Sequence, residues 1–195
     1  MDLAMSLTLF IFLLPLLLVV ALMVKLGDGG PVFFSHARCG FGGRMFRCHK
    51  FRTMHTDAAA RLEHLLATDP EARREWAETQ KLRNDPRITP IGRILRKSSI
   101  DELPQLLNII MGQMSVIGPR PITTSETHRY GVHFADYASV RPGVLGLWQV
   151  SGRNNTTYDE RVALDVEYVR NWSLWLDIKI LFKAIPAVLF AKGAY

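Results

Sequence analysis

Residues 3–24 form a run of 22 positions without a charged side chain. As one continuous α-helix this run would be about 33 Å long, which is enough to cross the hydrocarbon core of a bilayer. A secretory signal peptide would have basic residues before the apolar run and a small-residue cleavage site after it. Here Met1 and Asp2 precede the run and Lys25 follows it closely. The segment is therefore predicted to remain in the protein and to meet the membrane.

Pro15 lies near the middle of this run and leaves two arrangements open. A membrane helix tolerates proline when neighbouring groups satisfy the freed carbonyl, so the segment could span the bilayer with a kink. Alternatively, the proline breaks the helix, and the two halves enter and leave the same leaflet as a hairpin. In both arrangements the basic residues after position 24 place the rest of the chain on the cytoplasmic side.

The chain is basic, with 24 Lys and Arg against 18 Asp and Glu. Of the 24, 16 lie between Lys25 and Arg120, which predicts an anionic partner such as lipid headgroups, nucleic acid or a phosphorylated substrate. The only cysteines are Cys39 and Cys48, too few for a disulfide-stabilised secreted domain. Their spacing from nearby histidines matches no standard zinc finger, so free thiols are expected.

Two short β-type runs, residues 32–34 and 45–52, flank the glycine-rich residues 40–43 and predict a β-hairpin. Alternation along the second run places Lys50 and Arg52 on one face of its strand. These two cations either line a site or belong to a solvated edge strand.

Helical patterns cover much of the remaining chain. One helix is predicted at residues 58–67, and a second from the N-cap Asp69 to about Leu82. The pattern from residue 159 to about 190 predicts a helix that Pro186 kinks or ends. Its aromatic and basic residues indicate a helix lying in the membrane interface; they are Trp172, Trp175, Lys179 and Lys183.

Asp101 and Glu102 form a pair of adjacent acids preceded by a basic segment and followed by an apolar helix. If Asp101 is the N-cap, Pro104 falls in the first turn, where a proline is harmless. The helix dipole would then keep Asp101 ionised, and Glu102 would point about 100° away around the axis. If Ser99 is the cap instead, Ser99 and Glu102 form a capping box. We prefer the Asp101 placement, although both acids would also suit plain helix capping.

Two further segments carry candidate binding residues. Arg120 lies between two prolines, which restrict the backbone on both sides of it. A guanidinium held in this way could bind a phosphate through two parallel hydrogen bonds, or it could form a structural salt bridge. The glycine-punctuated residues 141–155 contain Trp148, Gln149 and Arg153. This mixture is typical of a pocket that binds a ligand by stacking on its ring and by hydrogen bonds to its hydroxyl groups. Alternatively, Trp148 is simply a buried residue of the hydrophobic core.

Four ordered segments resemble the signatures of one enzyme family. They are KFRTM at residues 50–54, DELPQLLN at 101–108, MSVIGPRP at 114–121 and PGVLGLWQVSGR at 142–153. In this order they resemble the bacterial sugar transferases, the monotopic polyprenyl-phosphate sugar-1-phosphate phosphoglycosyl transferases. Residues 58–84 and 171–177 look like the branch that transfers galactose or glucose phosphate.

The resemblance implies transfer of a hexose 1-phosphate from a UDP-sugar to undecaprenyl phosphate, with release of UMP, at the start of exopolysaccharide or O-antigen synthesis. It further implies Mg²⁺ as cofactor, bound by Asp101 and Glu102. Asp101 matches the family's nucleophile, which carries the sugar phosphate covalently, and Glu102 matches its dyad partner. The implied phosphate-binding residues are Lys50, Arg52, Arg96 and Arg120.

The fold implied is α+β and mostly α. Residues 1–27 would form a re-entrant helix broken at Pro15, where Leu14 replaces the serine usual in the family. Residues 28–195 would form the catalytic domain, with a small β-hairpin and an interfacial amphipathic C-terminal helix. The implied location is the cytoplasmic face of the bacterial inner membrane. The expected partners are the two substrates and membrane lipid, with a homodimer left open and no nucleic acid.

Two other classes of protein account for less of the sequence. A membrane-tethered basic adaptor without catalytic activity would use the charge but leaves the acid pair and Arg120 unexplained. A nucleic-acid binder needs basic charge, but basic charge alone does not indicate one.

Overall fold

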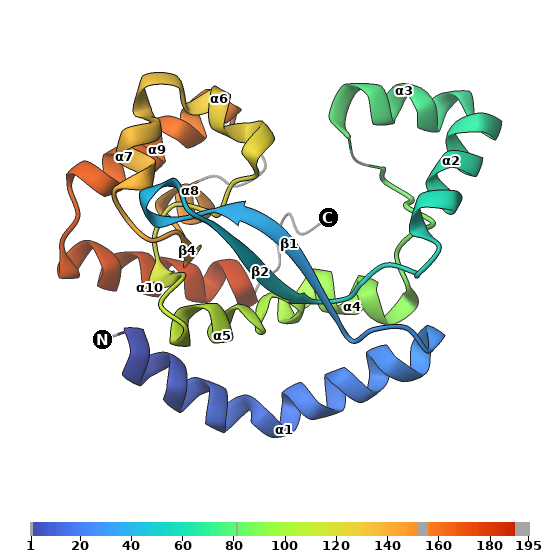
Figure 1. The fold of residues 1–195 in the computed structure, drawn as a ribbon, viewed down its shortest axis with the longest axis horizontal. Helices are drawn as coiled ribbons and strands as arrows, with labels where there is room; N and C mark the ends of the chain where they lie inside the picture. The colour runs from blue at the N-terminus through green and yellow to red at the C-terminus, as the bar shows by residue number, and fades with distance from the viewer. Residues whose placement is uncertain (1, 81, 152–155, 190–195) are drawn as a thin grey trace.

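The computed structural model describes residues 2–80, 82–151 and 156–189 and shows the predicted α+β class with mostly helices (Figure 1). The α-helices are α1 (Asp2–Asp28), α2 (Ala58–Thr68), α3 (Pro70–Thr79), α4 (Pro90–Ser98), α5 (Gln105–Ile110), α6 (Thr127–Tyr130), α7 (Phe134–Ala138), α8 (Leu147–Ser151), α9 (Tyr158–Arg170) and α10 (Leu174–Leu189). The strands are β1 (Phe33–Cys39), β2 (Met45–Phe51), β3 (Ser115–Ile117) and β4 (Gly143–Leu145). Short 3₁₀ turns are η1 (Phe41–Gly43), η2 (Ile100–Glu102), η3 (Thr124–Glu126) and η4 (Gly131–His133).

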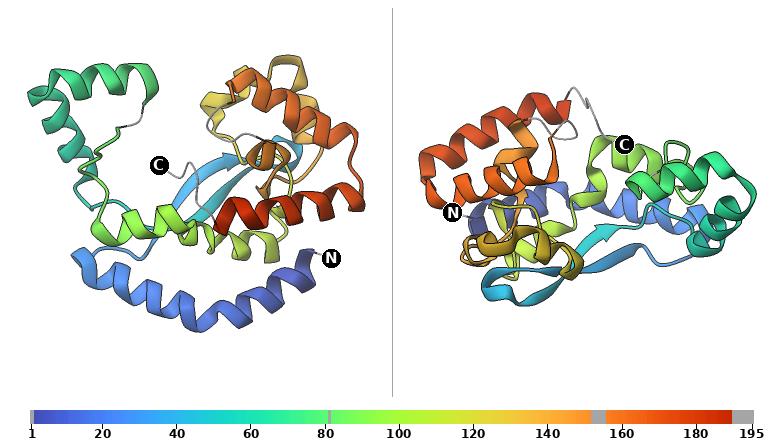
Figure 2. Two further views of the ribbon diagram at one scale, coloured as in Figure 1. Left: turned by 180° about the vertical axis from the view of Figure 1, so that it is seen from behind. Right: turned by 90° about the horizontal axis from the view of Figure 1, so that it is seen from above.

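Helix α1 runs without interruption through Pro15 and curves beneath the rest of the molecule (Figures 1 and 2). The sequence left a kink and a break at this proline both open, and the family resemblance implied the break, whereas the structure shows one curved helix. A proline inside a helix removes one backbone hydrogen bond and crowds the preceding turn, and curvature can accommodate both effects. Within the described residues, α1 is the one helix long and apolar enough to cross a membrane.

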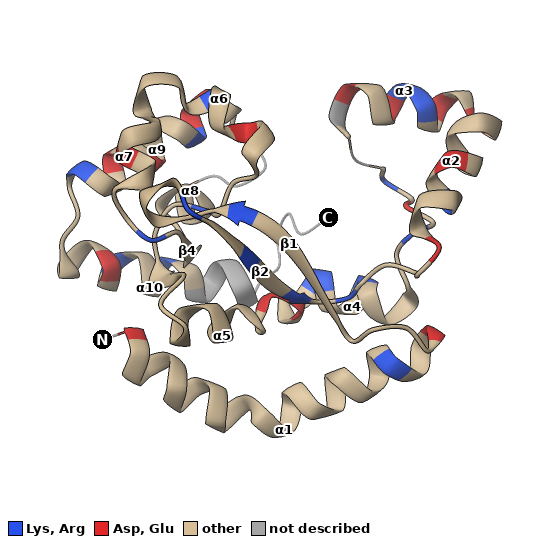
Figure 3. Ribbon diagram, viewed as in Figure 1, with Lys and Arg blue, Asp and Glu red and all other residues tan. Residues whose placement is uncertain are grey.

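One face of α1 packs against the protein. Leu17, Val20 and Val24 are buried in a cluster with Phe51 of β2 and Leu95 of α4. Other large apolar residues of α1 remain exposed, including Phe12 at 79%. Charged residues occur only near the two ends of the helix (Figure 3). An apolar surface of this kind is suited to lipid rather than to water.

Both ends of α1 are tied to the same body. At the N-terminal end, the Ser115 hydroxyl donates a hydrogen bond to Asp2 over 2.7 Å. At the C-terminal end, Asp28 pairs with the Arg52 guanidinium and accepts a hydrogen bond from the Thr56 amide. The helix therefore begins and ends against the same domain.

The predicted hairpin is confirmed. Strands β1 and β2 pair antiparallel from Phe33 opposite Phe51 to Cys39 opposite Met45, and the glycine-rich segment turns between them. β1 is longer than the three residues predicted for it. A second, parallel pair joins β3 to β4.

Cys39 and Cys48 are buried free thiols, as expected, and they lie in separate hydrophobic clusters.

Helices α2 and α3 form an arm that projects from the body (Figure 1). Asp69 is the N-cap of α3, as predicted, and accepts hydrogen bonds from the amides of Glu71 and Ala72. α3 ends at Thr79, earlier than the predicted Leu82, because Gln80 adopts the left-handed conformation with φ of 54°. At the root of the arm, the Arg87 guanidinium lies 4.8 Å from the Trp76 ring centroid and 2.7 Å from a carboxylate oxygen of Asp85.

The single C-terminal helix predicted from residue 159 is wrong. The structure has two helices, α9 and α10, separated at residues 171–173. The side chains of Tyr168 and Trp172 both donate hydrogen bonds to Asp177, which bridges the two helices. The backbone of α10 continues through Pro186, and Trp172 and Trp175 are exposed as an interfacial helix would require.

Asp165 of α9 is buried beside Tyr130 and Tyr137 in one of the hydrophobic clusters. It accepts a 2.6 Å hydrogen bond from the Tyr130 hydroxyl, and Arg161 Nε lies 3.9 Å from its Oδ2. Burial raises the pKa of the Asp165 carboxyl to about 6, although Tyr130 and Arg161 act in the opposite direction.

We expect Asp165→Asn to remove a pH dependence of stability between about pH 4 and pH 6. Because the folded protein binds this proton more tightly than the unfolded chain, the carboxyl stabilises the fold fully below about pH 4. That contribution is lost as the pH rises through about 6. Relative to the variant, the free energy of unfolding of the wild type in detergent should fall by roughly 3 kcal/mol across this window.

Asp159→Asn is the matched control, because Asp159 is an exposed acid on the same helix. Its unfolding free energy should parallel that of the wild type over the same pH range. Parallel curves for the wild type and Asp165→Asn would contradict the assignment.

Candidate active site

The acid pair lies in a 3₁₀ turn rather than at a helix N-cap. Ser99 ends α4 in the left-handed conformation with φ of 58°, the turn η2 follows, and α5 begins at Gln105. Both predicted caps are therefore wrong, since Asp101 lies inside the turn and Ser99 makes no side-chain cap. The left-handed residue redirects the chain before a helix can start at Asp101.

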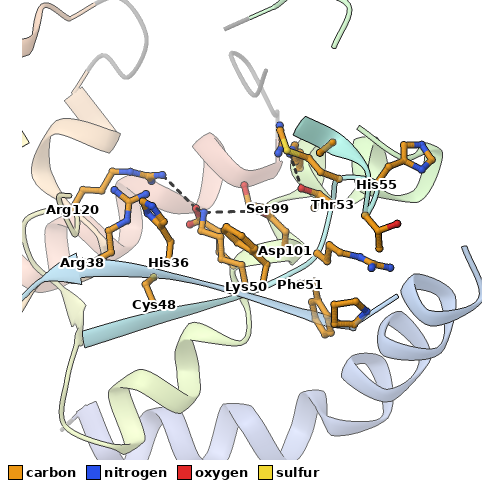
Figure 4. Close-up of a pocket in the computed structure, with 18 of the residues that line it drawn as sticks. His36, Arg38, Cys48, Lys50, Phe51, Thr53, His55, Ser99, Asp101 and Arg120 are labelled. Carbon is orange, nitrogen blue, oxygen red and sulfur yellow. Dashed lines mark hydrogen bonds and ion pairs between the residues drawn. The ribbon is translucent and has the colours of Figure 1, made fainter. Parts of the chain in front are cut away.

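Both acids face the ammonium group of Lys50, which Figure 4 shows in the cavity together with Asp101 and Arg120. Lys50 Nζ lies 2.6 Å from Glu102 Oε1 and 3.9 Å from Asp101 Oδ2. Arg120 approaches Glu102 Oε1 from another direction at 3.6 Å. Asp101 and Glu102 therefore line one cavity.

The two carboxyl groups differ in acidity. Burial raises the pKa of Asp101 above its ordinary value, and the nearby Glu102 adds to this while Lys50 opposes it. Burial would also raise the pKa of Glu102, but Arg120 and Lys50 outweigh it and hold that pKa below its usual range. Glu102 is thus the firmly paired carboxylate, and Asp101 is the less tightly held one.

Arg120 is mounted on the end of the β3–β4 pair. The two strands approach so closely that a Cβ on Gly143 would lie 2.1 Å from the Gly118 nitrogen. After Pro119 and Arg120, the carbonyl of Pro121 accepts a hydrogen bond from Arg38. Close packing and two prolines therefore hold the backbone on both sides of this guanidinium.

Arg96 reaches the cavity because α4 packs directly on the chain that follows β2. The Thr89 amide donates to the Thr53 carbonyl, and a Cβ on Gly92 would lie 2.0 Å from that same oxygen. One turn further along α4, Arg96 Nε donates a 2.9 Å hydrogen bond to the Thr53 hydroxyl. The small residue at position 92 thus lets Arg96 reach the cavity wall.

Arg52 also lines the cavity, but its guanidinium is paired with Asp28. It is 8% exposed, and the neighbouring Gly30 leaves room for it, since a Cβ there would lie 1.7 Å from Nη1. Arg52 therefore joins the end of α1 to the site, and its predicted contact with phosphate stays a prediction.

Trp148 and Gln149 line the far wall of the cavity. The Arg161 guanidinium lies 5.2 Å from the Trp148 ring centroid, so the protein itself contacts one face of this ring. The Gln149 amide donates a hydrogen bond to the Val144 carbonyl. Arg153, the third residue predicted for this pocket, lies outside the described residues.

The cavity has a volume of about 790 Å³ and includes residues that the sequence analysis missed. Phe34, His36 and Arg38 occupy alternate positions of β1 and line its wall. Strand alternation would have placed them together, but the sequence predicted β1 only as far as Phe34.

The donor set is compatible with Mg²⁺. In the described part of the chain, no three His, Cys, Asp or Glu side chains cluster as metal ligands. Mg²⁺ in phosphate-transfer sites is nevertheless commonly held by one or two carboxylates together with substrate phosphates and water. Asp101 and Glu102 provide two such carboxylates on one cavity wall.

Comparison with known proteins gives a consistent result. The family described as Bacterial sugar transferase matches residues 1–191. Exopolysaccharide production protein ExoY of Rhizobium meliloti is 51% identical over 99% of this chain and 85% of its own length. UDP-galactose-lipid carrier transferase of Erwinia amylovora is 51% identical, and undecaprenyl-phosphate galactose phosphotransferase of Salmonella typhimurium is 49% identical, each over 100% of this chain. The chain spans 40% of the length of each of these two longer relatives.

We expect Gly92→Ala to destabilise the protein by roughly 1–3 kcal/mol, because overpacking forces neighbouring backbone to move. The new methyl group would overlap the Thr53 carbonyl and push α4 away. Gly27→Ala is the matched control, since its Cβ would meet its nearest neighbour at 3.9 Å. Thermal unfolding in one detergent compares the three proteins, and equal melting temperatures would show that the close approach is unimportant.

Proposed function

The chain belongs to the bacterial sugar transferase family, which makes it a polyprenyl-phosphate sugar-1-phosphate transferase, and we propose that it acts on a UDP-hexose. In this proposal the hexose 1-phosphate passes to undecaprenyl phosphate and UMP is released, which starts an exopolysaccharide or O-antigen unit. The names of the relatives support galactose first, with glucose as the other candidate. The observation that carries the proposal is the Asp101–Glu102 pair facing Lys50 and Arg120 in one cavity.

The cations bind the diphosphate of the donor. Lys50 and Arg120 already converge on Glu102, and Arg96 lines the same cavity. Fixed positive groups around a pyrophosphate neutralise its charge without reorganising during the reaction. Arg120 can also present two parallel N–H groups to a phosphate, which a lysine cannot.

Asp101 is the nucleophile. Its carboxylate lies 3.9 Å from Lys50, whereas Glu102 is engaged at 2.6 Å, so Asp101 has the freer oxygen. That oxygen forms a bond to the phosphorus attached to the sugar, and the bond from this phosphorus to the bridging oxygen breaks. UMP leaves with the electron pair. A phosphate oxygen of undecaprenyl phosphate then attacks the same phosphorus and releases Asp101.

Glu102 keeps Lys50 and Arg120 in place while Asp101 reacts. Asp101 and Glu102 would also hold Mg²⁺ together with the substrate phosphates. When bound, this ion supplies additional neutralisation of the charge on the diphosphate.

The membrane arrangement fits a lipid acceptor. The exposed apolar face of α1 is suited to the bilayer, and its two ends contact the catalytic domain through Asp2 and Asp28. Both contacts support a monotopic protein whose helix enters and leaves one leaflet. The catalytic domain then lies on the cytoplasmic face of the inner membrane, where UDP-sugars are available.

Incubation with UDP-galactose and Mg²⁺, without lipid, should attach one hexose phosphate to the peptide containing Asp101. Mass spectrometry detects the adduct, and an assay for UMP measures its release. Asp101→Asn should abolish both, because an amide is a poor nucleophile. Glu102→Gln is the matched comparison: it should form the adduct more slowly, because Lys50 and Arg120 lose their partner, but any adduct should still lie on Asp101.

An adduct on Glu102, or UMP release only when both substrates are present, would show that the two-step mechanism is wrong. Repeating the assay with UDP-glucose and undecaprenyl phosphate identifies the preferred sugar. Lipid binding without any UMP release would favour the membrane-tethered adaptor instead.

The monotopic arrangement predicts that both ends of α1 are cytoplasmic. Cysteine introduced as Leu3→Cys or Lys25→Cys, in a chain with Cys39 and Cys48 replaced by alanine, probes the two ends; Leu3 and Lys25 are both exposed. A membrane-impermeant maleimide should label neither position in intact cells and both after permeabilisation. Labelling of position 3 alone in intact cells would show that the helix spans the bilayer.

A further inference from the structure

Phe34 lines the cavity, yet it remains 53% exposed. It lies opposite Lys50 in the hairpin register, and His36 lies opposite Cys48. Cross-strand partners project from the same face of a sheet, so Phe34, His36 and Lys50 share one face. A large apolar side chain that keeps more than half of its surface open on a cavity wall is typical of a ligand-binding surface.

The opposite face of the hairpin turns toward α1. There Phe33 stacks on Phe51 with ring centroids 5.4 Å apart, and Phe51 is buried against Leu17 and Val20 of α1. Because neighbouring residues of a strand point to opposite faces, the face with Phe34 turns away from the membrane helix. Figure 4 shows His36 and Lys50 on the cavity side of the hairpin, with α1 on the other side.

His36 extends the aromatic surface along β1. Its ring is nearly parallel to that of Phe34, with an angle of 13° and centroids 6.3 Å apart. Burial and the neighbouring Arg38 lower the pKa of His36, which favours its uncharged form. The two rings therefore present an apolar, flat surface next to the cations.

The face combines this flat surface with the positive charges of Lys50 and Arg38. A ligand that matches both parts carries a planar ring and phosphate groups together. The polyprenyl chain of the acceptor is not planar, and it remains in the bilayer on the side of α1. The chemistry therefore indicates the nucleotide half of the donor.

We propose that Phe34, supported by His36, stacks on the uracil ring of the UDP-sugar and of the departing UMP. This inference rests on the proposed function and assigns the nucleotide subsite to the cavity face of β1. The phosphates extend from this subsite toward Lys50 and Arg120, and the sugar phosphate thereby reaches Asp101. Stacking alone holds the ring without reading its hydrogen-bonding edge.

The test compares UMP with ribose 5-phosphate, which has a phosphate and a ribose but no base. Isothermal titration of the full chain in detergent measures both affinities. Phe34→Leu should weaken UMP binding by about tenfold or more, in line with the cost of losing one base–aromatic stack. Ribose 5-phosphate binding should not change, and the KM for UDP-galactose should rise with that for undecaprenyl phosphate unchanged.

Two variants serve as controls. Phe34→Trp keeps an aromatic face and should retain UMP binding. Phe33→Leu removes an equally exposed ring, 52% against 53%, from the opposite face and should bind UMP as the wild type does. Circular dichroism checks that each variant is folded.

The inference is overturned if Phe34→Leu binds UMP normally, if both variants at position 34 weaken it equally, or if only the KM for undecaprenyl phosphate rises. In these cases the wild type still releases UMP, and the proposed function stands. Failure of the wild type to release UMP from any UDP-sugar would instead overturn the proposed function itself, and this inference with it.

Discussion

The site depends on charge compensation for a buried acid, Asp101, and the partly buried acid that follows it, Glu102. Two neighbouring carboxylates in a poorly solvated turn repel each other and resist ionisation unless cations face them. Lys50 faces both acids, and Arg120 adds a second positive charge beside Glu102. The result is an uneven pair, in which Glu102 is held closely by the cations and Asp101 is held less tightly.

Lys50 and Arg96 reach the cavity because helix α1 organises the segments that carry them. Phe51 and Leu95 pack together on the inner face of α1, and they are the sequence neighbours of Lys50 and Arg96. Burial of apolar side chains against α1 therefore fixes the position of β2 and α4 relative to each other. The apolar helix α1 therefore supports the segments that carry Lys50 and Arg96 into the cavity.

Local patterns predicted the hairpin, the cap at Asp69 and the apolar helix, because each depends on residues close in sequence. The left-handed Ser99 was not predicted, since a non-glycine residue adopts that conformation only when tertiary packing requires it. No local pattern could place Arg120 beside Glu102, and only the family resemblance suggested a common site. Curvature at a proline, as in α1, also depends on what the helix packs against.

The arm formed by α2 and α3 contributes almost nothing to the hydrophobic core. α2 buries no residue, and in the described part of α3 the buried apolar side chain is that of Ala72. Arg87 holds the root of the arm through Trp76 and Asp85, so its attachment is polar and local. Surface substitutions on such a segment change the free energy of folding little. Ala58, at the start of α2, lines the cavity. The part of the cavity wall formed by this arm can therefore change in sequence during evolution without loss of the fold.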